Sequence, residues 1–258
     1  MIVEPGTTRI GWIGLGVMGR SMCAHLVDAG FSATVYTRTQ ETADSVLAKG
    51  ATWADTPKAV AEQSDVMFTI VGFPTDVREV VLGPDGALAG CEAGNVLVDM
   101  TTSEPSLAVE IYEAAKAKGV ASVDAPVSGG PQGARDAALT MMVGGPSAAL
   151  ERVRPLLALL GPTVIHLGES GAGQTTKACH QLALLVTAQG VAEALTLARR
   201  CGLDVERVRQ VMMGGMASSR VLDLFGARMA SRDFGAGIES RLYHKDLDIA
   251  LGLAHERG

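Results

Sequence analysis

Aromatic residues are scarce in this sequence. Phe, Trp and Tyr together make up 4% of the 258 residues, and charged residues only 19%. Hydrophobic residues reach 47%, so burial must be supplied mainly by Ala, Val, Leu and Met, in a composition typical of globular proteins. A chain of this length can bury one large core or two modest ones, so the number of domains has to be argued from the residue pattern.

Basic tracts are also missing. The sequence contains no run of Lys or Arg, and its formal net charge is -6. A negative protein is repelled by nucleic acid, so we expect no nucleic-acid partner. An anionic substrate would need a local pocket for its charge.

The sequence has no pattern of secretion or membrane insertion. Residues 1–8 contain no basic segment followed by a long apolar stretch, so we expect no signal peptide. The longest apolar region, residues 182–198, is interrupted by polar side chains such as Gln189 and Glu193, unlike a membrane span. We therefore expect a cytoplasmic protein without a membrane partner.

Cysteine pairs of the C-x-x-C kind do not occur, which favours reduced thiols over a disulfide framework or a zinc site. The cysteines are Cys23, Cys91, Cys179 and Cys201. Four histidines likewise lack metal-ligand spacing to carboxylates or cysteines, and we expect no metal. They are His25, His166, His244 and His255.

What the sequence does contain is an alternation of short β-branched runs with amphipathic stretches up to about residue 168. The expected strands are residues 10–13, 33–36, 66–71, 96–99, 121–124, 141–143 and 164–167. Two of these runs, at 66–71 and 96–98, are apolar throughout, as strands buried on both faces of a parallel sheet are. The glycines at 30, 50 and 119 and the Thr56-Pro57 pair fit helix ends and a helix start.

Beyond residue 173 the pattern is helical. We expect helices at 174–201, 204–213 and 218–229, and a last helix opening near Lys245. The predicted fold is therefore α/β: a Rossmann-type doubly wound parallel sheet, residues 1–170, joined by the long helix to a smaller all-α domain, residues 171–258. Because the last helix opens close to Gly258, we expect the natural chain to continue. In this sequence, Leu247, Ile249 and Leu253 would then lack part of their packing partners.

A glycine-rich loop follows the first expected strand directly. It has the spacing G-x-G-x-x-G, and its residues are Gly14, Leu15, Gly16, Val17, Met18 and Gly19. The first glycine permits a tight turn, the second lets the backbone approach a pyrophosphate, and the third lets the helix pack closely on the strand. In this strand, loop and helix context the motif predicts binding of a dinucleotide.

The second expected strand ends in Thr37, Arg38 and Thr39 rather than in a carboxylate. NAD-binding domains normally place Asp or Glu there for the ribose 2'-hydroxyl, whereas an Arg can pair with a 2'-phosphate. The sequence therefore favours NADP over NAD. The alternative is a solvated Arg38 beside either cofactor.

Four further motifs occur in order along the chain: DMTTSEP at 99–105, DAPVSGG at 124–130, GAGQTTK at 171–177 and KDL at 245–247. With the N-terminal loop, they make the sequence resemble the beta-hydroxyacid dehydrogenases over nearly its whole length. This family includes 3-hydroxyisobutyrate dehydrogenase, tartronate semialdehyde reductase and the glyoxylate/succinic semialdehyde reductases.

The resemblance implies a role for each motif. It makes Ser128, Gly129 and Gly130 the clamp for the substrate carboxylate, although two adjacent glycines also suit an ordinary tight turn. It places Phe73-Pro74 and Thr102 along the nicotinamide half of the cofactor. Core packing for Phe73 and helix capping for Thr102 are the alternatives.

By the same resemblance, Lys177 is the catalytic residue. Interconversion of an alcohol and a carbonyl needs a proton to move at the substrate oxygen, and a lysine can do this when its pKa is depressed. His180 and Gln181 lie three and four residues further on, on one helical face with Lys177, and are expected to bind the substrate. Many relatives carry two asparagines there.

The resemblance also gives the late Lys245-Asp246 pair, with Lys245 expected at the cofactor. Gln181 and the segment GGMASS at 214–219 favour tartronate semialdehyde reductase slightly over 3-hydroxyisobutyrate dehydrogenase. Two alternatives stay open. One is a non-catalytic NADP-binding protein of the same fold. The other is a decarboxylating enzyme like 6-phosphogluconate dehydrogenase, because the His at position 180 resembles that family. We expect a small carboxylate-bearing substrate and a homo-dimer or homo-tetramer.

Overall fold

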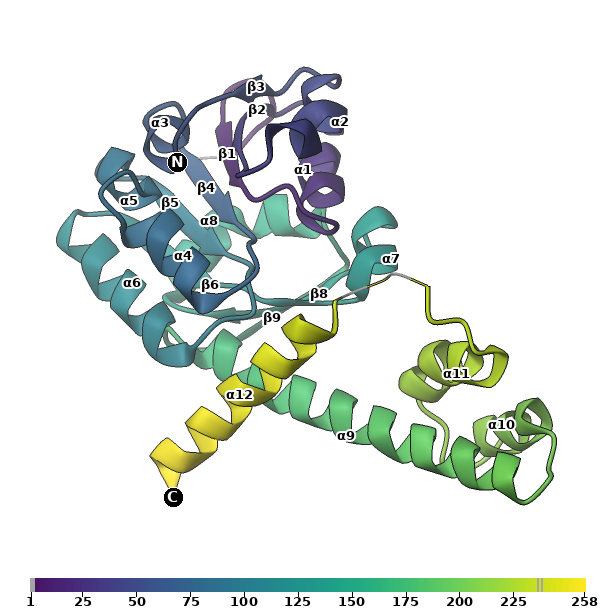
Figure 1. Cartoon of the computed structure of the whole chain (residues 1–258). Helices are drawn as coiled ribbons and strands as arrows, with labels where there is room; N and C mark the ends of the chain where they lie inside the picture. The colour runs from purple at the N-terminus through teal and green to yellow at the C-terminus, as the bar shows by residue number, and fades with distance from the viewer. Residues whose placement is uncertain (1–2, 236, 238) are drawn as a thin grey trace. The chain divides into compact units, whose positions relative to one another are not determined.

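The computed structural model describes residues 3–235, 237 and 239–258. The chain divides into two compact units, Met1–Lys177 and Ala178–Gly258 (Figure 1).

The first unit contains a nine-stranded sheet among the residues described, in the order β3-β2-β1-β4-β5-β6-β8-β7, with β9 beside β8. The strands are β1 (Arg9–Ile13), β2 (Ser32–Tyr36), β3 (Thr52–Trp53), β4 (Val66–Thr69), β5 (Val96–Asp99), β6 (Ala121–Asp124), β7 (Val127–Ser128), β8 (Thr140–Gly144) and β9 (Thr163–Gly168). Each run expected to be a strand is one, and the α/β prediction is confirmed. The two-residue strands β3 and β7 were not expected.

Pairing is parallel from β3 through β6. Strand β8 runs antiparallel to β6 and β7, and β9 is parallel to β8. The sheet is thus parallel in the half that begins with the glycine loop and mixed at the other edge. The carboxyl ends of β1, β4, β5 and β6 consequently lie along one edge of the sheet.

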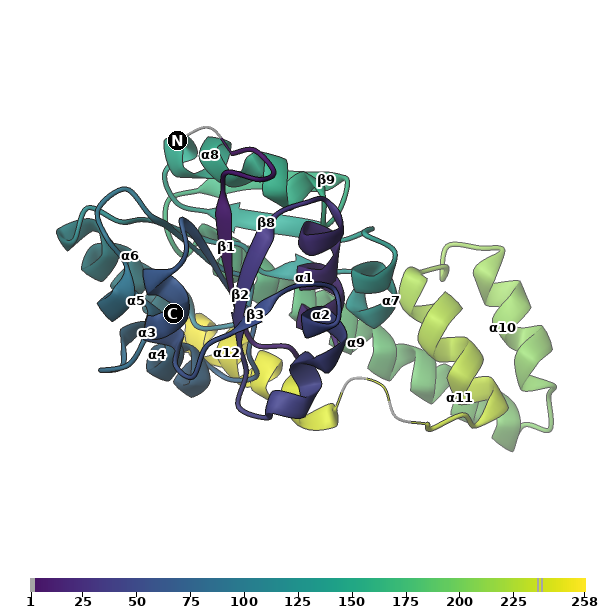
Figure 2. The same ribbon diagram turned by 90° about the horizontal axis from the view of Figure 1, so that it is seen from above.

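Helices cover both faces of this sheet (Figure 2). They are α1 (Gly19–Asp28), the 3-10 turn η1 (Gln40–Ala43), α2 (Asp44–Leu47), α3 (Pro57–Glu62), α4 (Pro74–Leu82), α5 (Ala87–Gly90), α6 (Pro105–Ala117), α7 (Gly130–Arg135) and α8 (Ser147–Ala158). Successive strand residues point to opposite faces, so Trp12 enters one core cluster with Phe68 while Ile13 enters the other with Met67. This is the doubly wound arrangement.

The expected helix boundaries are largely confirmed in this unit. Gly30, Gly50 and Gly119 have φ of +90°, +101° and +71°, the left-handed region in which glycine ends helices without steric cost. Thr56 accepts a hydrogen bond from the Ala59 backbone N–H at 3.0 Å, and Pro57 begins α3. These local signals mark where the helices begin and end.

The second unit is helical. Helix α9 (Ala172–Arg200) begins in the first unit and is followed by α10 (Val205–Met213), the π-helical segment η2 (Leu222–Gly226), α11 (Ala227–Ser231) and α12 (Ser240–Arg257). Its small core contains Val191, Leu195 and Leu222. Among the described helices, α9 is long and apolar enough to cross a membrane, with a mean hydropathy of 1.3 over its most apolar window.

Two expectations for the second unit are wrong. The last helix does not open near Lys245 but five residues earlier, at Ser240. Ile249, expected to be under-covered, is only 8% exposed. The start was misplaced because Glu239, at the N-cap position, makes no side-chain capping hydrogen bond, so the usual sequence signal of a helix start is missing.

Candidate active site

The glycine loop between β1 and α1 is shaped by close backbone contacts. Gly14 has φ of +95°, and a Cβ built on it would lie 2.1 Å from the Ile70 carbonyl oxygen. A Cβ on Gly19 would lie 2.1 Å from the Gly14 oxygen. On Gly16, by contrast, a Cβ would meet no atom of the described chain within 4 Å. The loop is therefore tight at both ends and open at its middle glycine, as a pyrophosphate cradle requires.

Neighbouring side chains hold this loop in place. The buried Trp12 indole donates to the Gly14 carbonyl oxygen at 3.0 Å, and the Gly14 N–H donates to the Tyr36 oxygen at the end of β2, at 2.9 Å. Leu15 is fully buried in the core, whereas Val17 is half-exposed. Leu15 can therefore contribute to ligand binding only through its backbone.

Arg38 follows β2, between Thr37 and Thr39. Its guanidinium Nη1 lies 3.2 Å from Asp76 Oδ1, and its side chain is 75% exposed. Asp76 belongs to the first turn of α4, where its other oxygen accepts the Phe73 N–H at 3.0 Å. This carboxylate was not predicted from the sequence. Its signal is a capping pattern in which Phe73 is the N-cap residue and Asp76 lies three residues further on.

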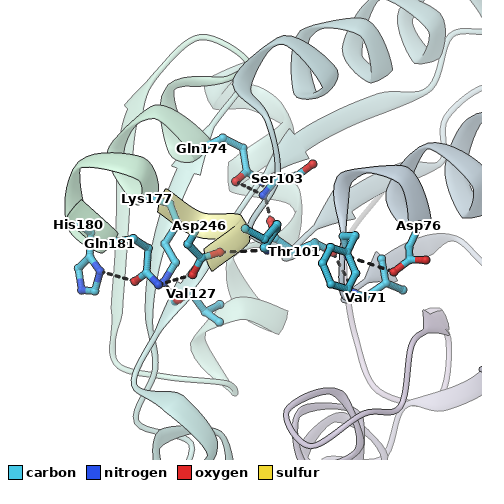
Figure 3. A network of polar contacts seen from close by, with 12 residues as sticks. Val71, Asp76, Thr101, Ser103, Val127, Gln174, Lys177, His180, Gln181 and Asp246 are labelled. Atoms are coloured by element: carbon cyan, nitrogen blue, oxygen red, sulfur yellow. Dashed lines mark hydrogen bonds and ion pairs between the residues drawn. The ribbon is translucent and has the colours of Figure 1, made fainter. Parts of the chain in front are cut away.

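A polar loop follows β5. The Thr101 hydroxyl oxygen accepts the Val71 N–H at 3.0 Å and so ties the ends of β4 and β5 together (Figure 3). Thr102, expected at the nicotinamide, is half-buried and comes next in the chain. Thr102 and Phe73 are thus brought to one edge of the sheet by two tied strand ends.

Two carboxylates end adjacent strands of this edge. Asp99, at the end of β5, accepts the Thr69 hydroxyl at 2.8 Å and the Thr101 N–H at 3.1 Å through Oδ1. Burial raises the pKa of Asp99 to about 6, against the opposing effect of those hydrogen bonds. Burial also raises the pKa of Asp124, at the end of β6. The sequence analysis quoted both acids but gave neither a role, although acids that end apolar strands are unusual enough to be noticed.

Lys177 lies on the first turns of α9. Its side chain is buried, and its Nζ donates to the Val127 carbonyl oxygen at 2.8 Å (Figure 3). Ser128, the next residue, ends β7, and Gly129 and Gly130 follow with φ of +135° and +63° at the start of α7. The structure therefore brings the expected catalytic lysine to the segment expected to clamp the substrate carboxylate.

The second unit holds its own polar cluster. The Gln181 amide donates to an Asp246 carboxylate oxygen, and His180 Nδ1 lies 2.9 Å from Gln181 Oε1. Lys245 Nζ is 3.0 Å from Asp246 Oδ1, with both side chains largely buried. Asp246 thus joins α9 to α12 and orders the two substrate-binding candidates.

Three of the four histidines considered as ligands have other partners. His25 Nε2 lies 2.9 Å from the Ala134 oxygen, His166 Nε2 lies 2.7 Å from the Gly145 oxygen, and His244 pairs with Asp248 at 3.0 Å. Within residues 3–235, 237 and 239–258, no group of three or more His, Cys, Asp or Glu side chains has metal-site geometry.

The chain matches two family models. The NAD-binding domain of 6-phosphogluconate dehydrogenase matches residues 9–168, and the NAD-binding domain of NADP-dependent 3-hydroxyisobutyrate dehydrogenase matches residues 171–258. Among curated proteins, the chain is 48% identical to a probable 3-hydroxyisobutyrate dehydrogenase-like protein of Arabidopsis thaliana, covering all of this chain and 77% of the relative. It is 40% identical to the 2-hydroxy-3-oxopropionate reductase of Escherichia coli, covering 94% and 83%.

Solved structures of 3-hydroxyisobutyrate dehydrogenases are also similar to this chain. The Mycobacterium tuberculosis 3-hydroxyisobutyrate dehydrogenase, solved with L-serine, is 30% identical with a TM-score of 0.86, and the match covers all of this chain and 88% of that one.

The raised pKa of Asp99 predicts a pH-dependent stability. Folding raises this pKa from 3.8 to about 6, so between these pH values the folded state binds more protons than the unfolded state. The stabilisation is fully present below pH 3.8 and is lost as the pH rises through about 6. Asp99→Asn keeps an oxygen that can accept both hydrogen bonds but has no such proton. Between pH 5 and pH 8, the free energy of unfolding of the unmodified protein should therefore fall relative to that of the variant, by roughly 1 to 2 kcal/mol, as measured by urea unfolding.

Asp65→Asn serves as the control. Arg9 lowers the pKa of Asp65, so this carboxyl is ionised in both the folded and the unfolded state above pH 5, and the unmodified protein and Asp65→Asn should have parallel stability profiles between pH 5 and pH 8. Parallel pH profiles for the unmodified protein and Asp99→Asn would contradict the assignment.

Proposed function

The chain belongs to the beta-hydroxyacid dehydrogenases, and from this membership we propose that it interconverts a small 3-hydroxy acid and its semialdehyde or keto acid by hydride transfer. It is an NAD(P)-dependent oxidoreductase. The observation that carries the proposed roles of its residues is the buried Lys177 ammonium donating to the Val127 carbonyl, one residue before the proposed carboxylate clamp.

The cofactor fits the glycine loop because the space at Gly16 is open while Gly14 and Gly19 hold the loop tightly. The residues proposed to hold it are Gly14, Leu15, Gly16, Val17, Met18, Gly19, Thr37, Arg38, Thr39, Phe73, Pro74, Thr102 and Lys245. Its nicotinamide ring supplies or accepts the hydride. The first N–H groups of α1 and the positive end of that helix favour a pyrophosphate at the loop.

The substrate carboxylate is proposed to bind at Ser128, Gly129 and Gly130. The positive φ angles of Gly129 and Gly130 support this proposal, because successive backbone N–H groups in turns of this kind can bind an anion. In a 3-hydroxy acid only a short carbon chain joins the carboxylate to the 3-oxygen. A substrate whose carboxylate is bound at this clamp would therefore have its 3-oxygen nearby. Lys177 donates to the residue that precedes this clamp, so its ammonium is already directed to that end of β7.

Lys177 is proposed to give a proton to the substrate oxygen during reduction and to take it back during oxidation. A lysine can serve as a general acid and base when it lies within hydrogen-bond reach of the reacting oxygen. His180 and Gln181 lie on the same face of α9, one turn further on, and are proposed to orient the substrate. The Gln181–Asp246 hydrogen bond fixes the amide for that purpose.

The substrate itself is best identified by steady-state rates on a panel with each cofactor. The panel is tartronate semialdehyde, succinic semialdehyde, glyoxylate, 3-hydroxyisobutyrate, L-serine and 6-phosphogluconate. We propose tartronate semialdehyde or 3-hydroxyisobutyrate as the preferred compound, because relatives of both kinds match over nearly the whole chain. Release of carbon dioxide from 6-phosphogluconate would favour the decarboxylating alternative, and no turnover of any compound would favour the non-catalytic one.

We further propose a cytoplasmic homo-dimer or homo-tetramer without a nucleic-acid or membrane partner. The net charge of -6 and the polar side chains along α9 support this proposal. Sedimentation of the purified protein distinguishes the two assemblies.

The cofactor preference is proposed to depend on Arg38. Its ion pair with Asp76 is exposed and hence weak, so the guanidinium can turn to a 2'-phosphate. Arg38→Ala should weaken NADPH binding by about tenfold or more, since a charged hydrogen bond contributes about 1.5 to 3 kcal/mol, and should leave NADH binding unchanged. Isothermal titration measures both. Arg9→Ala, which removes an exposed arginine at the start of β1, should change neither affinity. Equal affinities for both cofactors in the unmodified protein would contradict the preference.

The proton-transfer role of Lys177 has a distinct kinetic signature. Lys177→Ala should lower kcat by about 10² to 10⁴ and leave the cofactor Kd nearly unchanged, because the lost interaction acts in the transition state. His180→Asn should change kcat by less than about tenfold, near the 1.4 kcal/mol of one hydrogen bond. Lys58→Ala, an exposed lysine on α3, is the control and should have no effect. If His180→Asn abolishes turnover while Lys177→Ala retains it, the roles are reversed.

A further inference from the structure

The start of α9 is attached to the sheet by contacts that do not involve any residue assigned to binding or catalysis. We propose that Asp124 and Gln174 are positioning residues that fix the first turn of α9 and thereby hold the Lys177 ammonium at the Val127 carbonyl. The effect on turnover rests on the proposed function of Lys177. All the contacts lie within the first unit.

Asp124 caps α9 from a neighbouring strand. Its Oδ1 accepts the Gly171 N–H at 2.8 Å, and its Oδ2 accepts the Gln174 N–H at 2.9 Å. The first N–H groups of a helix have no acceptor within the helix, and the positive end of the helix favours an anion. Because two oxygens of one carboxylate bind N–H groups three residues apart, Asp124 fixes both the position and the rotation of the helix start.

Gln174 attaches the same turn to the loop after β5. Its side chain is fully buried; its Oε1 accepts the Ser103 N–H at 2.9 Å, and its Nε2 donates to the Thr101 carbonyl oxygen at 2.7 Å (Figure 3). Lys177 lies three residues further along the helix, on the adjacent turn. The helix is thus held on one side by β6 and on the other by the β5 loop.

Backbone packing leaves no room for the helix start to slide. A Cβ built on Gly173 would lie 2.4 Å from the Met142 carbonyl oxygen, and one on Gly144 would lie 2.7 Å from the Gly173 nitrogen. The backbone of the helix therefore lies directly against the backbone of β8. Neither Gly173 nor Gly144 has a side chain that could separate the two backbones and absorb a shift.

These contacts form a closed ring. Asp124 binds the helix start, Lys177 extends from that helix, and its ammonium returns to Val127, three residues after Asp124 in the chain. A displacement of about 1 Å at a reacting group can cost about 10²-fold in rate. Loss of the hydrogen bonds of Asp124 or Gln174 should therefore displace the Lys177 side chain.

The test is a double-mutant cycle on kcat with the full-length chain. Asp124→Asn replaces an anion by an amide whose NH₂ group must face a backbone N–H, and Gln174→Met removes both side-chain hydrogen bonds at similar size. Each should lower kcat by about 10- to 100-fold with KM nearly unchanged, and by less than about twofold when Lys177 is already Ala. Equal losses in both backgrounds would overturn the proposal. If Asp124→Asn fails to fold, Gln174→Met carries the same cycle.

Two controls separate positioning from general loss of stability and from failure of the proposed function. Thr56→Ala removes the cap of α3, which also destabilises the first unit, and should leave kcat unchanged. The second control is the rate at which an amine-acylating reagent modifies Lys177, read by mass spectrometry of the peptide with Lys58 as the internal reference. The rate should rise several-fold in both anchor variants.

The outcomes are then distinct. An unchanged Lys177 labelling rate in both variants overturns the positioning inference whatever the kinetics show. A raised labelling rate together with full activity of Lys177→Ala would support the anchor and refute the catalytic role of Lys177.

Discussion

A sheet buried on both faces leaves its polar groups no place except the strand ends. In this molecule, β4 and β5 carry apolar side chains to both sides, and their first polar positions are Thr69 and Asp99 at their carboxyl ends. Strand β6, which also contains the buried Ser122, ends in Asp124. Water is excluded there too, so these groups bind one another and the helix that begins beside them. The locations of Asp99, Asp124 and the loop that carries Thr102 follow from this constraint.

The low dielectric of the same edge gives it a particular electrostatic character. Two carboxylates with raised pKa values and a buried lysine lie in the first unit. Each makes a hydrogen bond to a backbone group: Asp99 to the Thr101 N–H, Asp124 to the Gly171 N–H and Lys177 to the Val127 carbonyl oxygen. Backbone dipoles are fixed by the fold, whereas a side-chain partner could move away. The edge is therefore preorganised before any ligand binds, which is where enzymes gain most of their electrostatic stabilisation.

Sequence reasoning succeeded where the chain leaves a local pattern. Short apolar runs that alternate with amphipathic stretches predicted the main strands, and the glycine spacing predicted the loop, which is tightly packed at both ends and open in the middle. It failed where structure depends on distant residues: β7 is too short to show a period, the reversal of β8 leaves no trace in its residues, and the Arg38–Asp76 pair joins positions 38 apart. Gln174 was read only as part of a motif, because its partners Thr101 and Ser103 are about seventy residues away.

Helix α9 has 29 residues and so measures about 43 Å, with its fixed end at the sheet and Lys177 only about 8 Å from that end. Asp124 binds backbone N–H groups at that end. A tilt of about 5° would carry the far end, at Arg200, through roughly 4 Å but would move Lys177 by less than about 1 Å. Lys177 therefore lies near the anchored end of α9, where the displacement caused by any tilt of the helix is smallest.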